Sequence, residues 1–283
     1  MTVDDLAGEL AVLRGVVPAE RAREWERALG LDAESLSIAL LGWASSFADP
    51  HISGFRVGAV AHAASGALYA GGNLEFSGAP LSFAVHAEQA AVANASLNGE
   101  REILSIATSA VPCGYCRQFL NELANADRLR VLVPKGHPMT LPELLPKAFG
   151  PAELRVAGDL LRAPAHGLVL ADAARTGRLV EAALDAANRS YAPYSKTYAG
   201  VALATGAGTI HVGRYAENVA FNPSLSPLQA ALVSLRLAGD APARLAEVVL
   251  VEADGPAEHG ETTAALLAAV SPVSLTVLRA IPA

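Results

Sequence analysis

The sequence predicts an α/β protein in which one layered domain occurs twice. Strand-like and helix-like segments alternate from residue 55 onward, and the alternation returns after a stretch rich in Pro and Gly. The chain has 283 residues, 52% of them hydrophobic and 17% charged. That length is long for one compact core, and this balance supports sizeable buried cores. We therefore expect two domains of ordinary size.

Residues 1–31 predict a helical arm in front of the first domain. Their apolar positions recur mostly every three or four residues, and Pro18 divides the pattern into two short helices. We expect this arm to be a packing element without chemistry. The apolar positions are Leu6, Leu10, Leu13, Val17, Ala22, Trp25 and Leu29.

Residues 32–150 are expected to form the first domain, with the order ββαβαβ. The strand-like segments FRVGAVAHA and GALYAGGNLEF flank a Ser-Gly turn and indicate a hairpin. The remaining segments are FAVHAEQAAVANASL (helix), ILSIATSAV (strand), CRQFLNELANA (helix) and LRVLVP (strand). This order is typical of a sheet covered by helices, with functional residues where strands lead into helices.

Residues 151–283 repeat the pattern after a linker at about residues 150–167. The segments are LVEAALDAANRSYAPYS (helix), GVALATGAGTIHVGRYAENVAF (strands), SPLQAALVSLRLAG (helix) and LAEVVLVEAD (strand). Aligning GGNLEF with GRYAENV places Glu75 over Glu217, and aligning EQAAV with LQAAL places Glu88 over Leu228. The chain therefore reads as a duplicated domain.

Charge and hydropathy narrow the possible partners. The formal net charge is −7, only three residues are Lys, and no Lys/Arg cluster suits a long nucleic acid. The N-terminus does not resemble a secretory signal, and apolar runs such as residues 262–278 are broken before a bilayer-spanning length. We expect a soluble cytoplasmic protein. In that reducing compartment, two neighbouring cysteines suggest a metal or redox site.

Three pairs of polar residues stand near predicted helix starts or strand ends. His86 and Glu88 open one helix, and Cys113 and Cys116 open the next. Zinc prefers thiolate and imidazole ligands, and a catalytic site keeps one position open for water, so one His and two Cys suit it. Glu88, two residues from His86, suits an acid/base role beside the metal. Asn73 and Glu75 form the third pair.

The spacing C-G-Y-C alone leaves a redox dithiol and half of a zinc site equally open. A dithiol leaves His86, Glu88 and the Asn73/Glu75 pair unexplained. The complete order H-x-E followed by P-C-x-x-C is the known signature of zinc deaminases, which favours the metal site.

Several segments together resemble the two-domain, homodimeric type of cytidine deaminase. They are GNLEFSG, VHAEQAA, PCGYCRQFLNEL, LLPKAFGP, NRSYAPYSK and YAENVAFNPSLSPLQAAL, and the resemblance runs from about Phe55 to the C-terminus. It implies duplicated three-layer α/β/α domains, each a mixed sheet with helices on both faces. It also implies one Zn²⁺ per chain and a role in pyrimidine salvage. The implied reaction is hydrolysis of cytidine and 2'-deoxycytidine to uridine and 2'-deoxyuridine plus ammonia.

The resemblance also implies a role for each matching residue. His86, Cys113 and Cys116 would bind zinc, and Glu88 would shuttle protons while zinc-activated hydroxide attacks C4. The implied nucleoside contacts are Asn73 and Glu75 to the sugar, Phe55 and the Ala87 backbone to the base, and Phe149 in the pocket wall. Ala220 and Phe221 match residues that a partner subunit's second domain lends to the site.

The second repeat departs from this pattern. Ser226, Pro227 and Leu228 replace His86, Ala87 and Glu88, and no Cys follows LAEVVLVEAD. We expect a non-catalytic domain that supports the fold and the dimer. The other six histidines lack matching partners and are expected on the surface or in loops; they are His51, His62, His137, His166, His211 and His259.

Two other functions remain open from the residues alone. A zinc deaminase could act on another amino-heterocycle, such as guanine or an aminopyrimidine antibiotic, although Asn73 and Glu75 favour a nucleoside. A structural zinc module is the alternative without catalysis, but it normally needs a fourth protein ligand and no further Cys exists. Acidic Glu75 favours a free nucleoside over a phosphate ester, and Arg56 is interpreted as a solvated strand charge.

Overall fold

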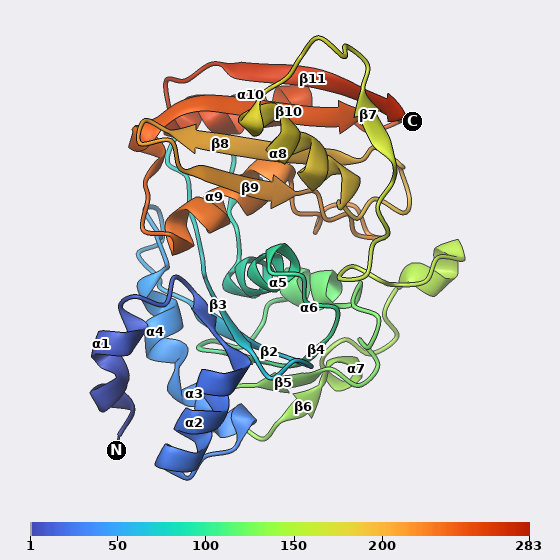
Figure 1. Cartoon of the computed structure of the whole chain (residues 1–283). Helices are drawn as coiled ribbons and strands as arrows, with labels where there is room; N and C mark the ends of the chain where they lie inside the picture. The colour runs from blue at the N-terminus through green and yellow to red at the C-terminus, as the bar shows by residue number, and fades with distance from the viewer. Residues whose placement is uncertain (1) are drawn as a thin grey trace. The chain divides into compact units, whose positions relative to one another are not determined.

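The computed structural model describes residues 2–283 and divides the chain into two compact units (Figure 1). The first unit comprises Met1–Glu75 and Ala84–Gly150, and the second comprises Phe76–Phe83 and Pro151–Ala283. The expectation of two compact bodies is met. The short segment Phe76–Phe83 groups with the second unit although its neighbours in sequence belong to the first.

The sheet of the first unit has six strands in the order β1-β3-β2-β4-β5-β6. Strands β2 and β3 form the predicted antiparallel hairpin, and β4 pairs in parallel with β5, so the sheet is mixed. The strands are β1 (Val16–Val17), β2 (Gly58–Ala63), β3 (Leu68–Gly72), β4 (Ile103–Thr108), β5 (Arg130–Leu132) and β6 (Met139–Thr140).

Helices cover both faces of this sheet. The α-helices are α1 (Ala7–Leu10), α2 (Ala19–Leu29), α3 (Ala33–Ala39), α4 (Leu41–Ser46), α5 (Ala87–Leu97), α6 (Gly114–Leu120) and α7 (Leu141–Leu144), and a 3-10 turn η1 spans Val3–Leu6. A Cβ on Gly71 would meet α5, whereas one on Gly72 would meet the chain just after α4. Successive strand residues point to opposite faces, so α5 and α4 lie on opposite sides. This confirms the three-layer α/β/α prediction.

The N-terminal segment contributes a strand that the sequence did not predict. Val16 and Val17 pair antiparallel with Tyr69 and Leu68 and add β1 to the edge of the sheet. Trp25 is buried in the core of the same unit, and the Asn94 amide donates to the Gly15 carbonyl. A two-residue strand shows no periodicity, and its partner residues are 51 and 53 positions away in sequence, so only the tertiary structure defines it.

The second unit has a five-stranded mixed sheet in the order β7-β11-β10-β8-β9, in which only β10 and β11 are parallel. The strands are β7 (Leu168–Leu170), β8 (Ala199–Thr205), β9 (Ile210–Arg214), β10 (Leu245–Ala253) and β11 (Leu275–Pro282). Helices α8 (Arg178–Asn188) and α9 (Pro227–Leu237) were predicted; α10 (Gly260–Val270) was not. The helix predicted through NRSYAPYS ends at Asn188, before Pro193.

The same close packing recurs in both units and supports the duplication. A Cβ on Gly58 would lie 2.4 Å from the backbone nitrogen of Ser45 in α4. A Cβ on Gly200 would lie 2.3 Å from the backbone nitrogen of Ala187 in α8. Gly58 of β2 and Gly200 of β8 therefore each allow a helix backbone to pack directly against the strand.

The remaining short elements are 3-10 turns, namely η2 (Leu81–Phe83), η3 (Pro151–Leu154) and η4 (Pro242–Arg244). Turn η2 is fixed within the second unit by Gln229 of α9, whose Nε2 donates to the Phe83 carbonyl at 2.8 Å. Across residues 2–283, every helix is too short or too polar to cross a bilayer.

Candidate active site

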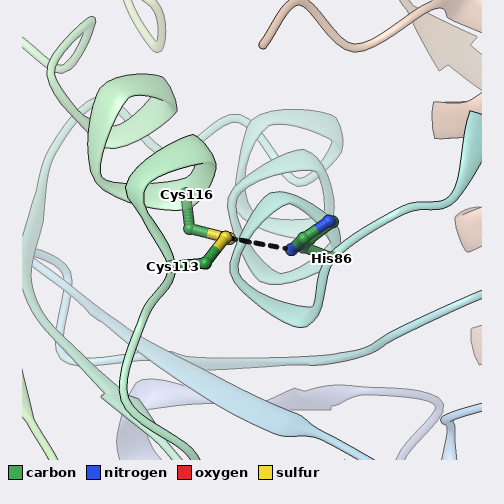
Figure 2. A group of neighbouring side chains, drawn as sticks. All are labelled: His86, Cys113 and Cys116. Atoms are coloured by element: carbon green, nitrogen blue, oxygen red, sulfur yellow. Dashed lines mark hydrogen bonds between the residues drawn. The ribbon is translucent and has the colours of Figure 1, made fainter. Parts of the chain in front are cut away.

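Three ligand-type side chains of the first unit converge between the starts of α5 and α6. The Nδ1 atom of His86 lies 3.2 Å from Sγ of Cys116 and 3.5 Å from Sγ of Cys113. The two sulfurs are 3.6 Å apart. Figure 2 shows both cysteines pointing from the start of α6 toward the imidazole. The predicted trio is therefore assembled in the fold.

Helix starts place all three residues. His86 is the N-cap of α5 and Cys113 the N-cap of α6, while Cys116 lies in the first turn of α6. Gln89 supports the first of these starts, because its Oε1 accepts a hydrogen bond from the His86 backbone nitrogen at 3.2 Å. Residues three apart in a first helical turn lie on one side, so Cys113 and Cys116 face the same point.

The donor set fits a zinc ion. A tetrahedral zinc with Zn–S distances of about 2.3 Å and Zn–N of about 2.0–2.1 Å separates its ligand atoms by roughly 3.6–3.8 Å. The three observed separations are 3.2, 3.5 and 3.6 Å. Within residues 2–283, His86, Cys113 and Cys116 form the one group of three or more His, Cys, Asp or Glu side chains suited to an ion.

The local electrostatics prepare one sulfur for metal binding. Hydrogen bonds from Cys116 and His86 lower the pKa of Cys113 to about 3, so this sulfur is a thiolate at neutral pH. The same bond with Cys113 and then burial raise the pKa of the Cys116 thiol. The hydrogen bond with Cys113 raises the pKa of His86. Thiolate sulfur is the form that binds zinc.

Glu88 lies in the first turn of α5, beside this group. Its side chain is only 4% exposed, and burial is the main cause that raises the pKa of its carboxyl. A carboxyl with a raised pKa can accept and return a proton near neutral pH, which is what a general acid/base needs.

A cavity of about 330 Å³ opens beside the metal-ligand group within the first unit. This volume is at the lower end of the range of about 300–1,000 Å³ typical of small-molecule sites. Its wall contains Glu88 and the ligands His86 and Cys113, together with the predicted nucleoside contacts Phe55, Asn73, Glu75 and Ala87. The fold thus brings the predicted chemistry and most of the predicted binding residues to one cavity.

Asn73 and Glu75 are both engaged with the chain segment that precedes β2. Asn73 accepts from the Val57 nitrogen at 2.8 Å and donates to the Phe55 carbonyl at 3.0 Å. Glu75 accepts from the backbone of Ile52 and Ser53 and from the Ser53 hydroxyl. Burial raises the pKa of Glu75, but the bonds from Ser53 and Ile52 outweigh it and lower the pKa overall. Glu75 is therefore an ionised acceptor at neutral pH.

The two predicted aromatic contacts differ in position. Phe55 is 63% exposed and lines the cavity. Phe149 is 50% exposed and is not among the cavity's lining residues; its carbonyl accepts from Gln118 of α6 at 2.9 Å. Within the described first unit, the structure thus brings Phe55 but not Phe149 to the site.

Ala220 and Phe221 lie in a loop of the second unit that follows β9. Phe221 is 65% exposed and has a positive φ of 61°. The loop holds it there, because the Phe221 nitrogen donates to Asn218 and its carbonyl accepts from Ser224, each at 2.9 Å. An exposed aromatic residue in the left-handed region costs conformational energy and is a mark of functional loops.

Sequence reasoning missed several lining residues, of which Ser53, Val57 and Val111 are examples. Ser53 had a detectable signal: the alignment that places Glu75 over Glu217 also places Ser53 over Ser195, so the serine occurs in both repeats. Val57 and Val111 are ordinary apolar residues without a motif, so only the fold reveals them.

The second unit has a different set of residues at the corresponding place. Ser226 is the N-cap of α9 and accepts from the Gln229 nitrogen, while Leu228 is fully buried. His211 is buried within β9, which corrects the expectation that it lies on the surface or in a loop; His259 is also buried, but it does lie in a loop, just before α10. His211 is on β9 with its Nε2 2.8 Å from Oδ2 of Asp240, and this paired position explains its burial.

Comparison with known proteins agrees with this geometry. Two models described as "Cytidine and deoxycytidylate deaminase zinc-binding region" match residues 34–132 and 141–264. Cytidine deaminases from Yersinia pestis and Yersinia pseudotuberculosis are 44% identical over 256 residues, covering 90% of this chain and 86% of theirs. The solved cytidine deaminase from Mycobacterium tuberculosis is 30% identical, with 41% of this chain and 95% of that chain covered and a TM-score of 0.38.

Two zinc-binding deaminase regions thus follow one another in a sequence that matches cytidine deaminases over nearly its whole length. Only the first region carries the His/Cys/Cys ligand group among the described residues. The chain belongs to the cytidine deaminase family, in its two-domain form.

Proposed function

We propose that the chain catalyses zinc-dependent hydrolysis of cytidine and 2'-deoxycytidine to uridine and 2'-deoxyuridine, with release of ammonia. The observation that carries this proposal is the convergence of His86, Cys113 and Cys116 beside buried Glu88 at one cavity. Three protein ligands leave a fourth position for water, as catalytic zinc sites require.

A bound zinc ion supplies Lewis acidity, which lowers the pKa of water toward about 7 and makes hydroxide available at neutral pH. Glu88 takes the proton of the attacking water and delivers it to N3 of the pyrimidine while C4 becomes tetrahedral. Glu88 then takes the remaining proton from the hydroxyl now on C4 and passes it to the amino group; the C4–N bond breaks, ammonia leaves, and the oxygen on C4 becomes the carbonyl of uridine. Its burial in the cavity wall keeps these protons away from bulk solvent.

The proposed nucleoside contacts follow from the cavity wall. Asn73 and Glu75 offer polar atoms to sugar hydroxyls, Phe55 offers a ring to the base, and Ala87 offers its backbone. The lining residues, all within the described first unit, include neither Lys nor Arg. Nearby Arg56 is engaged, since its Nη1 donates to the Ala48 carbonyl at 2.6 Å. A free nucleoside therefore suits the cavity better than its 5'-phosphate.

We also propose how the domains divide the work. Residues 32–150 form the catalytic domain, residues 151–283 a non-catalytic domain, and residues 1–31 an arm. In a homodimer, Ala220 and Phe221 of one subunit would contribute to the partner's site. Phe149 is proposed to line the nucleoside pocket. The exposed, positive-φ Phe221 supports this role.

The cytoplasm is the proposed location, and pyrimidine salvage the proposed role. The two metal-ligating thiols support the location, because a reducing compartment preserves free Cys113 and Cys116.

Replacement of Glu88 by Gln tests the proposed reaction. The purified wild-type chain is expected to contain one zinc per chain and to convert cytidine to uridine with release of ammonia. Glu88→Gln should lower turnover by about 10²–10⁴-fold, because proton transfer is lost. Zinc content should stay at one, since Glu88 is not a ligand.

The control and the substrate panel make this test specific. Glu20→Gln changes an exposed Glu in α2 and should leave turnover unchanged. A panel of cytidine, 2'-deoxycytidine, guanine and cytidine monophosphate, with ammonia detection, checks the substrate. Turnover that survives Glu88→Gln, or a preference for guanine, would contradict the proposal.

A further inference from the structure

The carboxylate of Glu75 is held by the turn that precedes Phe55. Its Oε2 accepts hydrogen bonds from the backbone nitrogens of Ile52 and Ser53, at 2.8 and 2.7 Å. Its Oε1 accepts one from the Ser53 hydroxyl at 2.5 Å. Most hydrogen-bond acceptor positions of Glu75, which is predicted to bind the sugar, are therefore used within the protein itself.

A count of acceptor positions shows what is left for a ligand. An ionised carboxylate offers about four acceptor positions, two on each oxygen. The two backbone bonds fill Oε2, and the Ser53 hydroxyl takes one position on Oε1. One position remains on Oε1. Glu75 can thus accept a hydrogen bond from one sugar hydroxyl, but it cannot bind a pair of neighbouring hydroxyls through both oxygens.

The Ser53 hydroxyl links two parts of the cavity wall. Its single proton goes to Glu75, and its oxygen accepts from the Phe55 backbone nitrogen at 3.0 Å. Because that proton is committed, Ser53 has none to donate to a ligand. Its influence on a bound nucleoside must act through the positions of Glu75 and Phe55.

The second unit provides an internal comparison without a metal-ligand group. Glu217, aligned with Glu75, accepts from the backbone nitrogens of Tyr194 and Ser195, at 2.7 and 3.1 Å. Ser195 in turn accepts from the Thr197 nitrogen at 3.1 Å, as Ser53 does from Phe55. The backbone part of this arrangement is therefore a property of the repeated fold and needs no substrate.

The two units differ at the other carboxylate oxygen. Oε1 of Glu217 lies 3.5 Å from the hydroxyl of Tyr215, whereas Oε1 of Glu75 is bound at 2.5 Å by the Ser53 hydroxyl. At the position aligned with Tyr215 the first unit has Asn73, which lines the cavity. The bond from Ser53 thus falls on the Glu75 oxygen that keeps one acceptor position open.

We propose that Ser53 is a positioning residue for nucleoside binding: its hydroxyl orients Glu75 so that one acceptor position of Oε1 receives a single sugar hydroxyl. This inference rests on the proposed function. It goes beyond it by giving a role to a residue outside the family motif and by setting the number of sugar hydroxyls that Glu75 reads.

Ser53→Ala tests the proposal through the separation of KM from kcat. The variant is expected to raise KM for cytidine and 2'-deoxycytidine about tenfold, the effect of weakening one hydrogen bond to a charged group. The value of kcat should remain within about twofold, because the bond aids binding and not the chemical step. For 2',3'-dideoxycytidine, which lacks the 2'- and 3'-hydroxyls that Glu75 would accept from, KM should stay at the wild-type value.

Two further variants separate positioning from simple loss of structure. Ser195→Ala removes the aligned hydroxyl of the second unit and should leave KM for all three nucleosides unchanged. Ser53→Thr keeps the hydroxyl, so its KM for cytidine should be close to the wild-type value and well below that of Ser53→Ala. Melting temperature and zinc content, measured on every variant, report whether the fold and the metal site survive.

The outcomes distinguish this inference from the proposed function. A wild-type chain without cytidine turnover refutes the proposed function itself. With an active wild type, the positioning role is overturned by an unchanged KM in Ser53→Ala. It is equally overturned by a KM that rises alike for dideoxycytidine, by a similar rise in Ser195→Ala, or by a Ser53→Thr variant that behaves like Ser53→Ala.

Discussion

Gly71 and Gly213 occupy equivalent points in the two sheets, and each brings a strand into direct contact with a helix backbone. A Cβ on Gly71 would lie 2.2 Å from the backbone nitrogen of Ala91 in α5, and one on Gly213 would lie 2.2 Å from that of Ala231 in α9. His86 is the N-cap of α5, so this contact sets the distance of a proposed zinc ligand from the sheet.

Gly71→Ala should therefore destabilise the first unit. The added methyl meets backbone atoms, which cannot rotate away, so α5 must move. Overpacking of this kind lowers the free energy of unfolding by about 1–3 kcal/mol or more, which urea unfolding would measure. Gly42→Ala is the control, since a Cβ there meets no atom within 4 Å and the residue lies in helix α4. Its unfolding free energy should be unchanged or slightly higher; equal losses in both variants would contradict the packing argument.

The sequence predicted the elements whose side chains follow a clear period. The alternating residues of β2 and β3, and the Ala-rich run that opens at His86, indicated a hairpin and a helix that the structure contains. The chemistry at the helix starts was also predictable, because few roles other than metal binding unite His86, Cys113 and Cys116.

The remaining features depend on contacts between distant segments. Strand β1 exists because Val16 pairs with Tyr69, and β7 because Leu168 pairs with Pro282. These strands have two and three residues, which is too short for a period to be detected. The attachment of Glu75 to the turn at Ser53 also joins residues 22 apart. The resemblance in sequence predicted Glu75 as a sugar contact but could not reveal that the protein itself uses most of its acceptor positions.

Loss of one ligand should remove the zinc. His86→Asn deletes the imidazole that faces both sulfurs, so zinc bound to the purified chain should fall from one equivalent to near zero by elemental analysis. His62→Asn is the matched control, because His62 is partly buried in β2 and lies outside the metal-ligand group. Retention of a full zinc equivalent by His86→Asn would argue against the ligand assignment.

Asn73→Ala should weaken both the fold and the site. The change leaves the Val57 nitrogen and the Phe55 carbonyl without their side-chain partners, at a cost of about 1–3 kcal/mol in the free energy of unfolding. Because Phe55 lines the cavity, KM for cytidine should rise as well.

Asn98→Ala is a comparison for this prediction. Asn98 caps the far end of α5, where its amide donates to the Asn94 carbonyl, away from the lining residues. The variant is expected to lose stability without a change in KM. If Asn73→Ala lost stability and kept the wild-type KM, Asn73 would be a structural residue and not a sugar contact.

The buried His259 should make the second unit less stable as the pH falls. Burial lowers the pKa of His259 below its ordinary value of 6.5, because the loss of hydration disfavours the imidazolium more than the Thr197 carbonyl and the carboxylates of Glu252 and Glu217 favour it. Between the lowered value and 6.5, the unfolded chain binds a proton that the folded chain does not. The stabilisation is therefore complete above pH 6.5 and is lost as the pH falls through the folded-state pKa.

Urea unfolding of the wild type and of His259→Gln between pH 8 and pH 5 measures this effect as the difference between their free energies of unfolding. His259→Gln keeps a polar side chain of similar reach but cannot titrate, so its unfolding free energy should fall less steeply below pH 6.5 than that of the wild type. His62 and His166 also have pKa values lowered by burial, but both remain in the variant and cancel in the difference. Parallel curves for the two chains would mean that Glu252 and Glu217, which favour the charged form, already compensate the burial of His259.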